Sequence, residues 1–367
     1  MNCGPQIIVP DIGESLALPP AGIEQMDWRD GLLIRSPNWL GDVVMTLPAM
    51  LQLKSLLPKN CGLFVACPKG LAPLFKAMRI VDWTLPLANP HAFMNRDEMG
   101  SVKRLQPGAC LIFNNSLRDV ISLRLCRIPK IYGASARMRD LLLTAAWKFP
   151  PRLDFTLNKP HHAAKYLSMA YALGAPEWQG GFPEILPQIE PEVCSQKLLS
   201  ALKEPMTLTV AAGAAYGDAK RWPSASFREI CRWWIEKKGG TVFIVGSKAE
   251  KSIADEVAQG LPEGKAFNFA GETKLEELIS LLKASKACIA NDSGVMHLAA
   301  ALGIVGVAVF GSTDPSATSP VSKSWRILFE KLDCSPCFKR DCPKNDKSCL
   351  SRITPEMATA ALDDLLS

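Results

Sequence analysis

Residues 287–311 read ACIANDSGVMHLAAALGIVGVAVFG, and this stretch decides the fold. It predicts a buried strand, a polar turn at residues 291–293, an apolar helix and a second buried strand. A turn that leads from a strand into a helix exposes backbone N–H groups, and the helix dipole favours an anion there. The simpler alternative is that Asp292 or Ser293 only caps the helix.

The same alternation of short apolar runs and amphipathic segments extends along the whole chain. It predicts an α/β protein of two Rossmann-like domains, each with a parallel sheet covered on both faces and with a central cleft between the domains. The expected division is an N-terminal extension at 1–29, a first domain at 30–180, a second at 181–350 and a C-terminal helix at 351–367. Strands are expected at 31–35, 63–67, 83–87, 109–113, 130–132, 208–212, 241–245, 267–270, 288–290, 305–310 and 326–329. Helices are expected at 119–126, 138–147, 162–173, 226–237, 248–259, 275–286, 294–302 and 355–366.

Composition excludes several classes of protein. The chain has 367 residues, of which 48% are hydrophobic and 21% are charged, as in globular domains. It contains no apolar run of 18 or more residues, and its first residues lack the basic and apolar regions of a secretory signal. A cytoplasmic location is therefore expected. The net charge of +6 suits a weak attraction to anionic lipid or substrate but is too small for a dedicated nucleic-acid binder.

Four of the twelve cysteines lie within sixteen residues, at Cys334, Cys337, Cys342 and Cys349. The spacing C-x2-C-x4-C-x6-C is compatible with zinc or an iron–sulfur cluster. However, the second pair lacks the close spacing of a standard zinc site, so a thiol-rich loop without metal is the other interpretation. No residue is assigned here as a metal ligand. The other eight cysteines are scattered, as small buried side chains in a reducing compartment would be.

Two loops that follow predicted strands carry residues suited to catalysis and anion binding. Asp42 ends the loop at residues 36–42, where it is either an N-cap or first-turn acid of the next helix or a carboxylate placed to accept a proton. Lys220 and Arg221 follow a loop of glycine and small residues, and such a pair suits a diphosphate. A solvated basic pair is the plainer interpretation. A third loop, at residues 271–273, precedes the motif at 291–297.

Several of these motifs together resemble the ADP-heptose:lipopolysaccharide heptosyltransferases of glycosyltransferase family 9. The similarity extends over residues 31–365, and several motifs in one order are far more specific than any one alone. The region before Asp30 does not belong to the pattern. The motifs are SPNWLGDVVMTLPA at 36–49, AKRWP at 219–223, GETKLEEL at 271–278, NDSGVMHLAAAL at 291–302, GSTDP at 311–315 and CSPCF at 334–338.

The resemblance implies a GT-B architecture, in which the first domain binds the acceptor and the second binds the nucleotide-sugar. It also implies inverting transfer of heptose from ADP-heptose to the lipopolysaccharide core, without a metal ion or cofactor and with no nucleic-acid partner. Peripheral contact with the cytoplasmic face of the inner membrane is a further expectation. By position, the general base is Asp42, the donor-binding residues are Lys220, Arg221, Glu272, Asp292, Ser293, Gly294 and His297, and the acceptor-binding residues are Asn38, Asn115, Ser116 and Arg118.

The chemistry of glycosyl transfer agrees with these roles. Negative charge builds on the leaving diphosphate, and Lys220, Arg221 and the backbone N–H groups near Ser293 would stabilise it. Asp42 would remove the proton of the acceptor hydroxyl during attack.

Other functions stay open. One is heptosyltransferase I or III, or another nucleotide-sugar transferase of the family. A sugar-nucleotide epimerase is disfavoured by the motif at 36–42. From a different class, a non-catalytic nucleotide-binding protein with a structural metal at the cysteine cluster is the remaining alternative.

Overall fold

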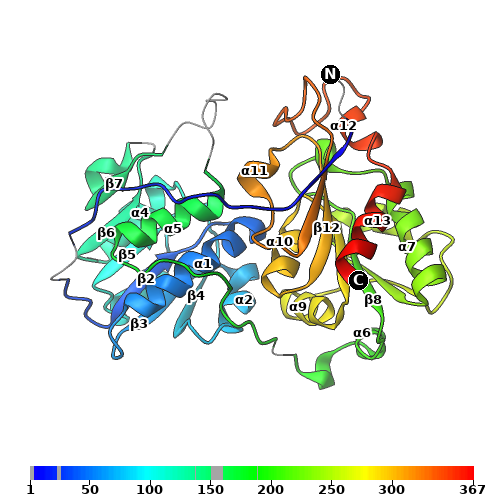
Figure 1. Cartoon of the computed structure of the whole chain (residues 1–367). Coiled ribbons are helices and arrows are strands. Elements are labelled where there is room, and N and C mark those ends of the chain that lie inside the picture. Colours follow the sequence, from blue (N-terminus) through cyan, green and yellow to red (C-terminus); the bar gives the residue numbers. More distant parts are fainter. Residues whose placement is uncertain (1–3, 23–25, 137, 150–159, 188) are drawn as a thin grey trace. The chain divides into compact units, whose positions relative to one another are not determined.

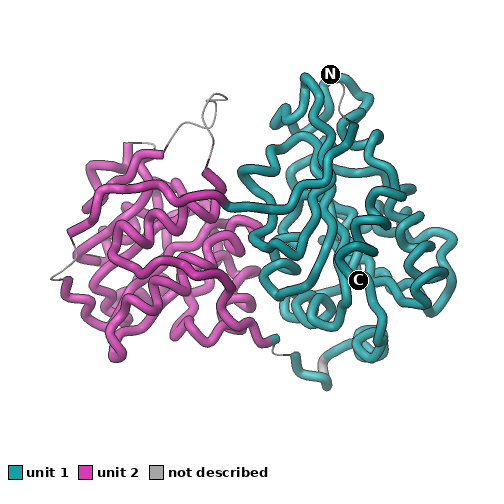
Figure 2. The backbone as a smooth tube through the Cα atoms, in the orientation of Figure 1, with its two compact units in different colours: residues 1–12, 187–367 teal, residues 13–186 magenta. Residues whose placement is uncertain are grey.

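The computed structural model describes residues 4–22, 26–136, 138–149, 160–187 and 189–367 (Figure 1). The chain forms two compact units (Figure 2). The N-terminal unit comprises residues 13–186, and the C-terminal unit comprises residues 187–367 together with residues 1–12. Each unit is built around its own sheet and is described by itself.

The N-terminal unit contains a six-stranded sheet in the order β4-β3-β2-β5-β6-β7, with every pair of neighbours parallel. The chain runs outward from β2 to β4, returns, and places β5 on the other side of β2. The switch point between β2 and β5 is where open α/β sheets bind ligands, beyond the carboxyl ends of the strands. The strands are β2 (Gly31–Arg35), β3 (Gly62–Pro68), β4 (Trp83–Leu87), β5 (Ala109–Ile112), β6 (Lys130–Ala134) and β7 (Ala145–Trp147). The helices are α1 (Leu40–Leu56), α2 (Ala72–Lys76), α3 (Arg96–Arg104), α4 (Leu117–Leu125) and α5 (His162–Ala172).

The C-terminal unit contains a seven-stranded sheet in the order β1-β13-β12-β11-β8-β9-β10. Its switch point lies between β8 and β11, which pair in parallel. The strands are β1 (Gln6–Ile8), β8 (Thr207–Ala211), β9 (Thr241–Ile244), β10 (Ala266–Asn268), β11 (Ala287–Asn291), β12 (Val305–Phe310) and β13 (Trp325–Phe329). The helices are α6 (Gln196–Ala201), α7 (Ser224–Lys238), α8 (Lys251–Ala258), α9 (Leu275–Ala284), α10 (Gly294–Ala301), α11 (Pro315–Thr318), α12 (Ser348–Ser351) and α13 (Pro355–Leu366).

Helices cover both faces of each sheet because parallel strands are joined by right-handed crossovers. In the C-terminal unit, α7, α8 and α13 share one core with the inward-facing residues of the strands. Two tryptophans of this core also satisfy backbone acceptors: Trp222 donates its indole N–H to the carbonyl of Ile353, and Trp234 donates to that of Met206. In the N-terminal unit, α1 packs against α5, and α3 packs against α4.

Two segments differ from the sequence-based expectations. Residues 138–147, expected as a helix, form a 3-10 turn (Arg139–Leu142) followed by β7, which pairs with β6. The fully buried Arg139 explains the turn, because its guanidinium donates to the carbonyls of Ala134 and Asn114. A straight helix would carry that side chain away from both acceptors. Residues 1–29, read as an extension, include β1, which pairs antiparallel with β13.

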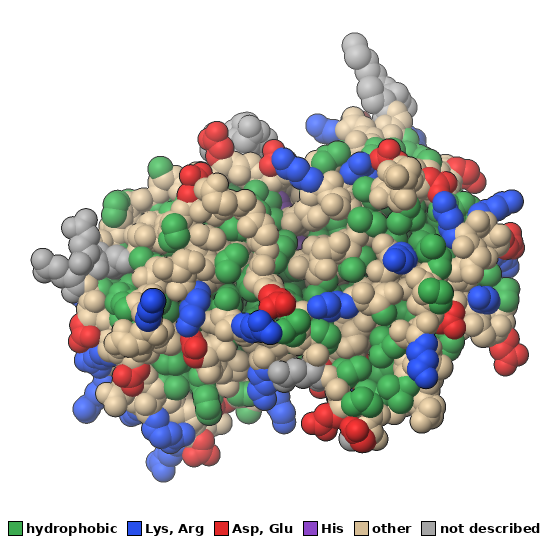
Figure 3. Space-filling view, turned by 60° about the horizontal axis from the view of Figure 1, so that its bottom comes forward, with side chains coloured by type: hydrophobic (Ala, Val, Ile, Leu, Met, Phe, Trp, Pro, Cys, Tyr) green, Lys and Arg blue, Asp and Glu red, His purple; other side chains and the backbone are tan. Residues whose placement is uncertain are grey.

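No helix within the described ranges is long and apolar enough to cross a membrane. Charged side chains of both signs are intermixed on the face shown in Figure 3 and do not gather into one continuous basic patch there. That face therefore lacks the charge distribution typical of a dedicated nucleic-acid binder.

Gly31 begins β2 at a position where any side chain would collide with the neighbouring strand. Its backbone has a φ of +151°, and an added Cβ would lie 1.9 Å from the carbonyl oxygen of Gly62. We expect Gly31→Ala to lower the free energy of unfolding by about 1–3 kcal/mol, the usual range for overpacking. Gly70→Ala is the control, because an added Cβ there has no neighbour within 4 Å. Urea denaturation curves that coincide for the two variants would contradict this.

Candidate functional site

The motif at 291–297 lies at the switch point of the C-terminal sheet, beyond the carboxyl end of β11. Asp292 is only 6% exposed, and its Oδ2 accepts a hydrogen bond from the Lys220 ammonium at 2.6 Å. The hydroxyl of Thr313 donates to the same oxygen, also at 2.6 Å. Lys220 follows β8, Thr313 follows β12, and both strands are neighbours of β11. One carboxylate therefore connects the loops that leave three adjacent strands.

The structure does not support capping as the role of this turn. Ser293 occupies the N-cap position of α10 with an extended backbone, but its side chain makes no capping hydrogen bond. Its hydroxyl oxygen is buried and has no hydrogen-bond partner within the described part of the chain. Gly294 is the first residue of the helix, and the buried His297 lies one turn inside. The hydroxyl of Ser293 and the first backbone N–H groups of α10 thus lie in the same turn, an arrangement that favours the binding of an anion.

Asn291 fixes the geometry of the β8–α7 loop, a role that the sequence motif did not indicate. Its amide nitrogen donates to the carbonyl of Ala212 at 2.6 Å, and its amide oxygen accepts from the backbone N–H of Trp222 at 3.0 Å. Asn291 is fully buried, so these contacts satisfy a side chain that water cannot reach. The loop that carries Lys220 and Arg221 is therefore held at both ends by the residue before Asp292.

Basic side chains and one aromatic ring surround Lys220. The Lys220 ammonium lies 5.0 Å from the centroid of the Tyr216 ring, and the guanidinium carbon of Arg340 lies 5.4 Å from the same centroid. The Nε of Arg221 is buried and has no hydrogen-bond partner among the described residues. Cationic groups beside one buried carboxylate, Asp292, give this loop the electrostatics of a phosphate-binding site.

Glu272, expected near the donor, lies on the loop that follows the edge strand β10. Its carboxylate pairs with the ammonium of Lys197 at 2.8 Å, and both side chains are partly exposed. This pair connects α6 to the β10–α9 loop. Lys220 follows β8, and Glu272 follows β10, which is two strands further toward the edge of the sheet. No contact among the described residues joins Glu272 to Lys220 or to Asp292.

The switch point of the N-terminal sheet contains a second buried ion pair. The Nε of Arg35 lies 2.9 Å from the Oδ2 of Asp119, although this N–H does not meet hydrogen-bond geometry. Both side chains are almost fully buried. Burial lowers the pKa of Arg35, and the charge of Asp119 opposes that shift. Since Arg35 ends β2 and Asp119 lies in the first turn of α4 after β5, the pair joins the two strands at the switch point.

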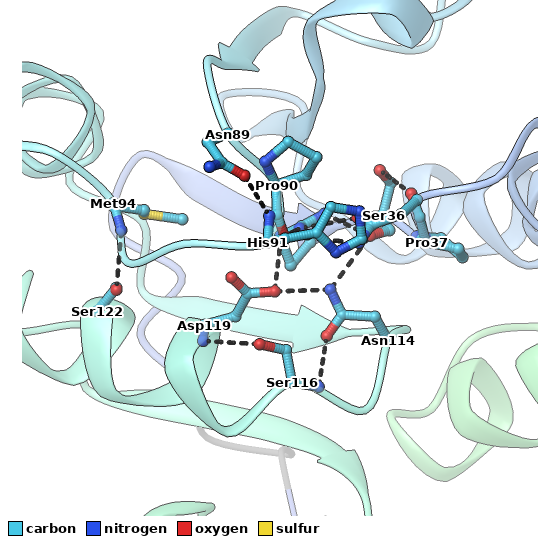
Figure 4. Close-up of polar contacts among 12 residues, drawn as sticks. Ser36, Pro37, Asn89, Pro90, His91, Met94, Asn114, Ser116, Asp119 and Ser122 are labelled. Atoms are coloured by element: carbon cyan, nitrogen blue, oxygen red, sulfur yellow. Dashed lines mark hydrogen bonds and ion pairs between the residues drawn. The ribbon is translucent and has the colours of Figure 1, made fainter.

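Arg35 and Asp119 also organise the two loops around them, and Figure 4 shows Asp119 beside Asn114 and Ser116. The guanidinium of Arg35 donates to the carbonyl of Ser36 at 2.6 Å and to the amide oxygen of Asn38 at 3.0 Å. Asn114 donates to the Asp119 carboxylate at 2.7 Å. The predicted acceptor residue Asn38 is thus held in place by Arg35, and the network includes Asn114, which the sequence did not single out.

The other predicted acceptor residues have different surroundings. The hydroxyl of Ser116 caps α4 by accepting from the backbone N–H of Asp119 at 3.2 Å. Asn115 and Arg118 are exposed beside this cap. Their side chains are therefore accessible at the carboxyl edge of the sheet, whereas Ser116 serves the helix terminus.

Asp42 is the third residue of α1 and is not its N-cap, a position that Trp39 occupies without a side-chain hydrogen bond. The Asp42 side chain is 35% exposed, and its Oδ1 lies 3.9 Å from the Nδ1 of His162, the first residue of α5. The first turn of a helix favours a negative charge. Asp42 is thus an accessible carboxylate with an imidazole beside it, and the sequence did not indicate the role of His162.

Comparison with known proteins identifies the family. Residues 103–347 match the sequence pattern of Glycosyltransferase family 9 (heptosyltransferase), which covers more than half of the chain. The chain belongs to glycosyltransferase family 9. Family membership confirms the expected class of enzyme and agrees with the Rossmann-like α/β build of both units.

Relatives within family 9 resemble the protein over almost their full length. Lipooligosaccharide heptosyltransferase 2 of Haemophilus influenzae is 28% identical over 92% of this chain and 99% of its own. Lipopolysaccharide heptosyltransferase 2 of Escherichia coli is 28% identical over 91% of this chain and 98% of its own. The solved structure of E. coli ADP-heptose lipopolysaccharide heptosyltransferase II superposes with a TM-score of 0.73 at 25% identity, covering 92% of this chain and 98% of that one. The expected GT-B fold class is thereby confirmed.

The Arg35–Asp119 pair yields a prediction about stability. Asp119→Ala leaves the buried guanidinium without its counter-charge, so we expect a loss of about 3–5 kcal/mol in the free energy of unfolding. The double variant Arg35→Met/Asp119→Leu removes both charges and should recover most of that loss. Denaturant titration followed by tryptophan fluorescence measures both. If the double variant is less stable than Asp119→Ala, the unpaired charge of Arg35 does not explain the loss of stability in the single variant.

Proposed function

We propose that the protein is an inverting glycosyltransferase of the heptosyltransferase II type, which transfers heptose from ADP-heptose to the inner core of lipopolysaccharide. The observation that supports this most directly is the cluster of Lys220, Asp292 and Thr313 at the switch point of the C-terminal sheet, in a chain of glycosyltransferase family 9. The full-length relatives named heptosyltransferase 2 support the choice of donor and acceptor.

The C-terminal unit supplies the donor site in this proposal. As the bond between the sugar and the diphosphate breaks, negative charge develops on the leaving ADP. Lys220 and Arg221 neutralise that charge together with the N–H groups at Ser293 and Gly294. Asp292 holds the Lys220 ammonium in position before the donor binds, so little reorganisation is needed during the reaction. Glu272 and His297 complete the proposed donor set, with Glu272 near the nucleoside.

The N-terminal unit supplies the acceptor site. Asp42 accepts the proton of the attacking hydroxyl, and attack on the face opposite the leaving group inverts the anomeric carbon. Asn38, Asn115, Ser116 and Arg118 form the acceptor-binding edge. Within this set, the exposed guanidinium of Arg118 suits an anionic group of the lipopolysaccharide core.

The acceptor carries a lipid anchor, so the reaction takes place at a membrane surface. We therefore place the protein in the cytoplasm, in peripheral contact with the cytoplasmic face of the inner membrane. The net charge of +6 supports such a contact because anionic lipids attract basic proteins.

A panel of acceptors tests the proposed function. Lipopolysaccharide with a single core heptose should accept one further heptose from ADP-heptose, with release of ADP, and product mass spectrometry measures this. Transfer only to a heptose-free core would assign the protein to the first heptosyltransferase step instead. Binding of ADP without transfer to any acceptor would favour a non-catalytic nucleotide-binding protein.

Asp42→Asn tests the assignment of the base. The amide cannot accept the proton, so we expect kcat to fall about 10²–10⁴-fold while the affinity for ADP is unchanged. Asp97→Asn is the matched control, because Asp97 is likewise a solvent-accessible acid in the first turn of a helix, α3. Equal kcat values for the two variants would exclude Asp42 as the base. A thermal melt of each variant separates a loss of fold from a loss of chemistry.

A further inference from the structure

The four clustered cysteines lie in the segment at residues 332–349, which follows β13 and ends in the first turn of α12. We call this segment the thiol loop. All four cysteines are free and partly buried. Most of the other described cysteines are fully buried among apolar neighbours, where a thiol packs as a small hydrophobic group. The thiol loop therefore differs from the remainder of the chain in presenting several accessible thiols together.

The four cysteines are all among the residues that line one small cavity. Its volume is about 20 Å³, and its lining includes Cys334, Cys337, Cys342, Cys349 and Asp346. A cavity of this size accommodates about one water-sized sphere. Soft thiolate ligands select zinc, copper(I) and iron, and four thiolates around one ion form a common structural metal site.

The backbone brings the cysteines together through tight turns. Phe338, Asn345 and Lys347 all have left-handed backbones, with φ between 46° and 55°. Non-glycine residues adopt this conformation only where the surrounding structure requires it. No three Cys, His, Asp or Glu side chains of the described residues are already arranged as metal ligands. Coordination therefore requires the thiols to turn about their Cα–Cβ bonds toward the cavity.

The thiol loop contacts the loop that follows β12. The backbone N–H of Phe338 donates to the carbonyl of Ser312 at 2.7 Å, and the hydroxyl of Ser335 donates to the carbonyl of Gly311 at 2.6 Å. These residues directly precede Thr313, which donates to Asp292. The position of the thiol loop is thereby coupled to the carboxylate at the centre of the donor site.

The thiol loop also contacts the loop that carries Lys220. The backbone N–H of Ala219 donates to the carbonyl of Arg340 at 2.9 Å, and the hydroxyl of Tyr216 donates to the carbonyl of Phe338 at 2.9 Å. Lys347 forms an ion pair with Asp218. Both loops that contact the Asp292 carboxylate therefore rest on the same thiol-bearing segment.

We propose that Cys334, Cys337, Cys342 and Cys349 bind one thiophilic metal ion, with zinc as the first candidate and iron as the second. The ion is structural: it closes the thiol loop and holds it against the loops of residues 213–221 and 311–313. Metal binding itself does not depend on the proposed transfer reaction.

Metal content tests the proposal without any activity assay. Protein expressed in zinc-supplemented medium and gel-filtered under reducing conditions should carry about one equivalent of zinc or iron, measured by plasma mass spectrometry. Cys337→Ser and Cys342→Ser should lose it. Cys194→Ser is the matched control, because Cys194 is free and partly buried but lies outside the thiol loop. A wild-type chain with no bound thiophilic metal, or loss of metal in Cys194→Ser alone, would overturn the proposal.

A second measurement uses the unchanged chain, so it remains informative if the serine variants fail to fold. Metal is removed with a chelator under reducing conditions, and cobalt(II) is then added. Binding by several thiolates should produce a sulfur-to-cobalt charge-transfer band at one equivalent, and zinc should displace it. Absence of that band with a correctly folded chain would contradict the site. If the band forms but transfer to every acceptor fails, the metal site stands and the proposed function does not.

Discussion

The ion pair between Asp292 and Lys220 is the interaction on which the proposed donor site depends. Parallel strands deliver their following loops to one edge of a sheet, and in the C-terminal unit the switch point brings the loops after β8 and β11 side by side. A buried carboxylate between them is stable only when it is paired. Lys220 and Thr313 supply that pairing, and the same contacts fix a cation where a diphosphate would bind.

The N-terminal unit also contains a buried ion pair at the switch point of its sheet, formed by different residues. Arg35 and Asp119 form a buried pair between the ends of β2 and β5, again at the switch point of a parallel sheet. The pair positions Asn38 and the loop that leads to α1, so that Asp42 enters the first helical turn at a defined place. Each unit thus has a buried charged pair at the switch point of its sheet, beside the residues proposed to bind substrate.

Much of this arrangement could be predicted from local sequence. The helix α13 (Pro355–Leu366) has the predicted bounds, since a proline at its start and an apolar stripe define it locally. Lys220 and Asp292 belong to motifs whose order identifies the family. The segment at 138–147 was predicted as a helix but forms a turn and a strand. The cause is not local, because the buried guanidinium of Arg139 donates to the carbonyls of Ala134 and Asn114.

The residues that contact the site residues could not be predicted from local sequence either, because they are distant in the chain. Thr313 is 21 positions from Asp292, and Asn291 is 69 positions from Trp222. Only the strand order makes these residues neighbours, and no periodic pattern records such pairings. His162 is likewise distant from Asp42 in sequence, and the packing of α5 against α1 brings the two together.

The central claim is that Lys220, held by Asp292, binds the diphosphate of the donor. Isothermal titration calorimetry of wild-type protein and Lys220→Met with ADP and with adenosine tests it most directly. The account predicts that the substitution weakens ADP binding about 10–100-fold, the usual range for a lost hydrogen bond to a charged group, and leaves adenosine binding unchanged. An equal loss for both ligands, or no loss for ADP, would contradict it.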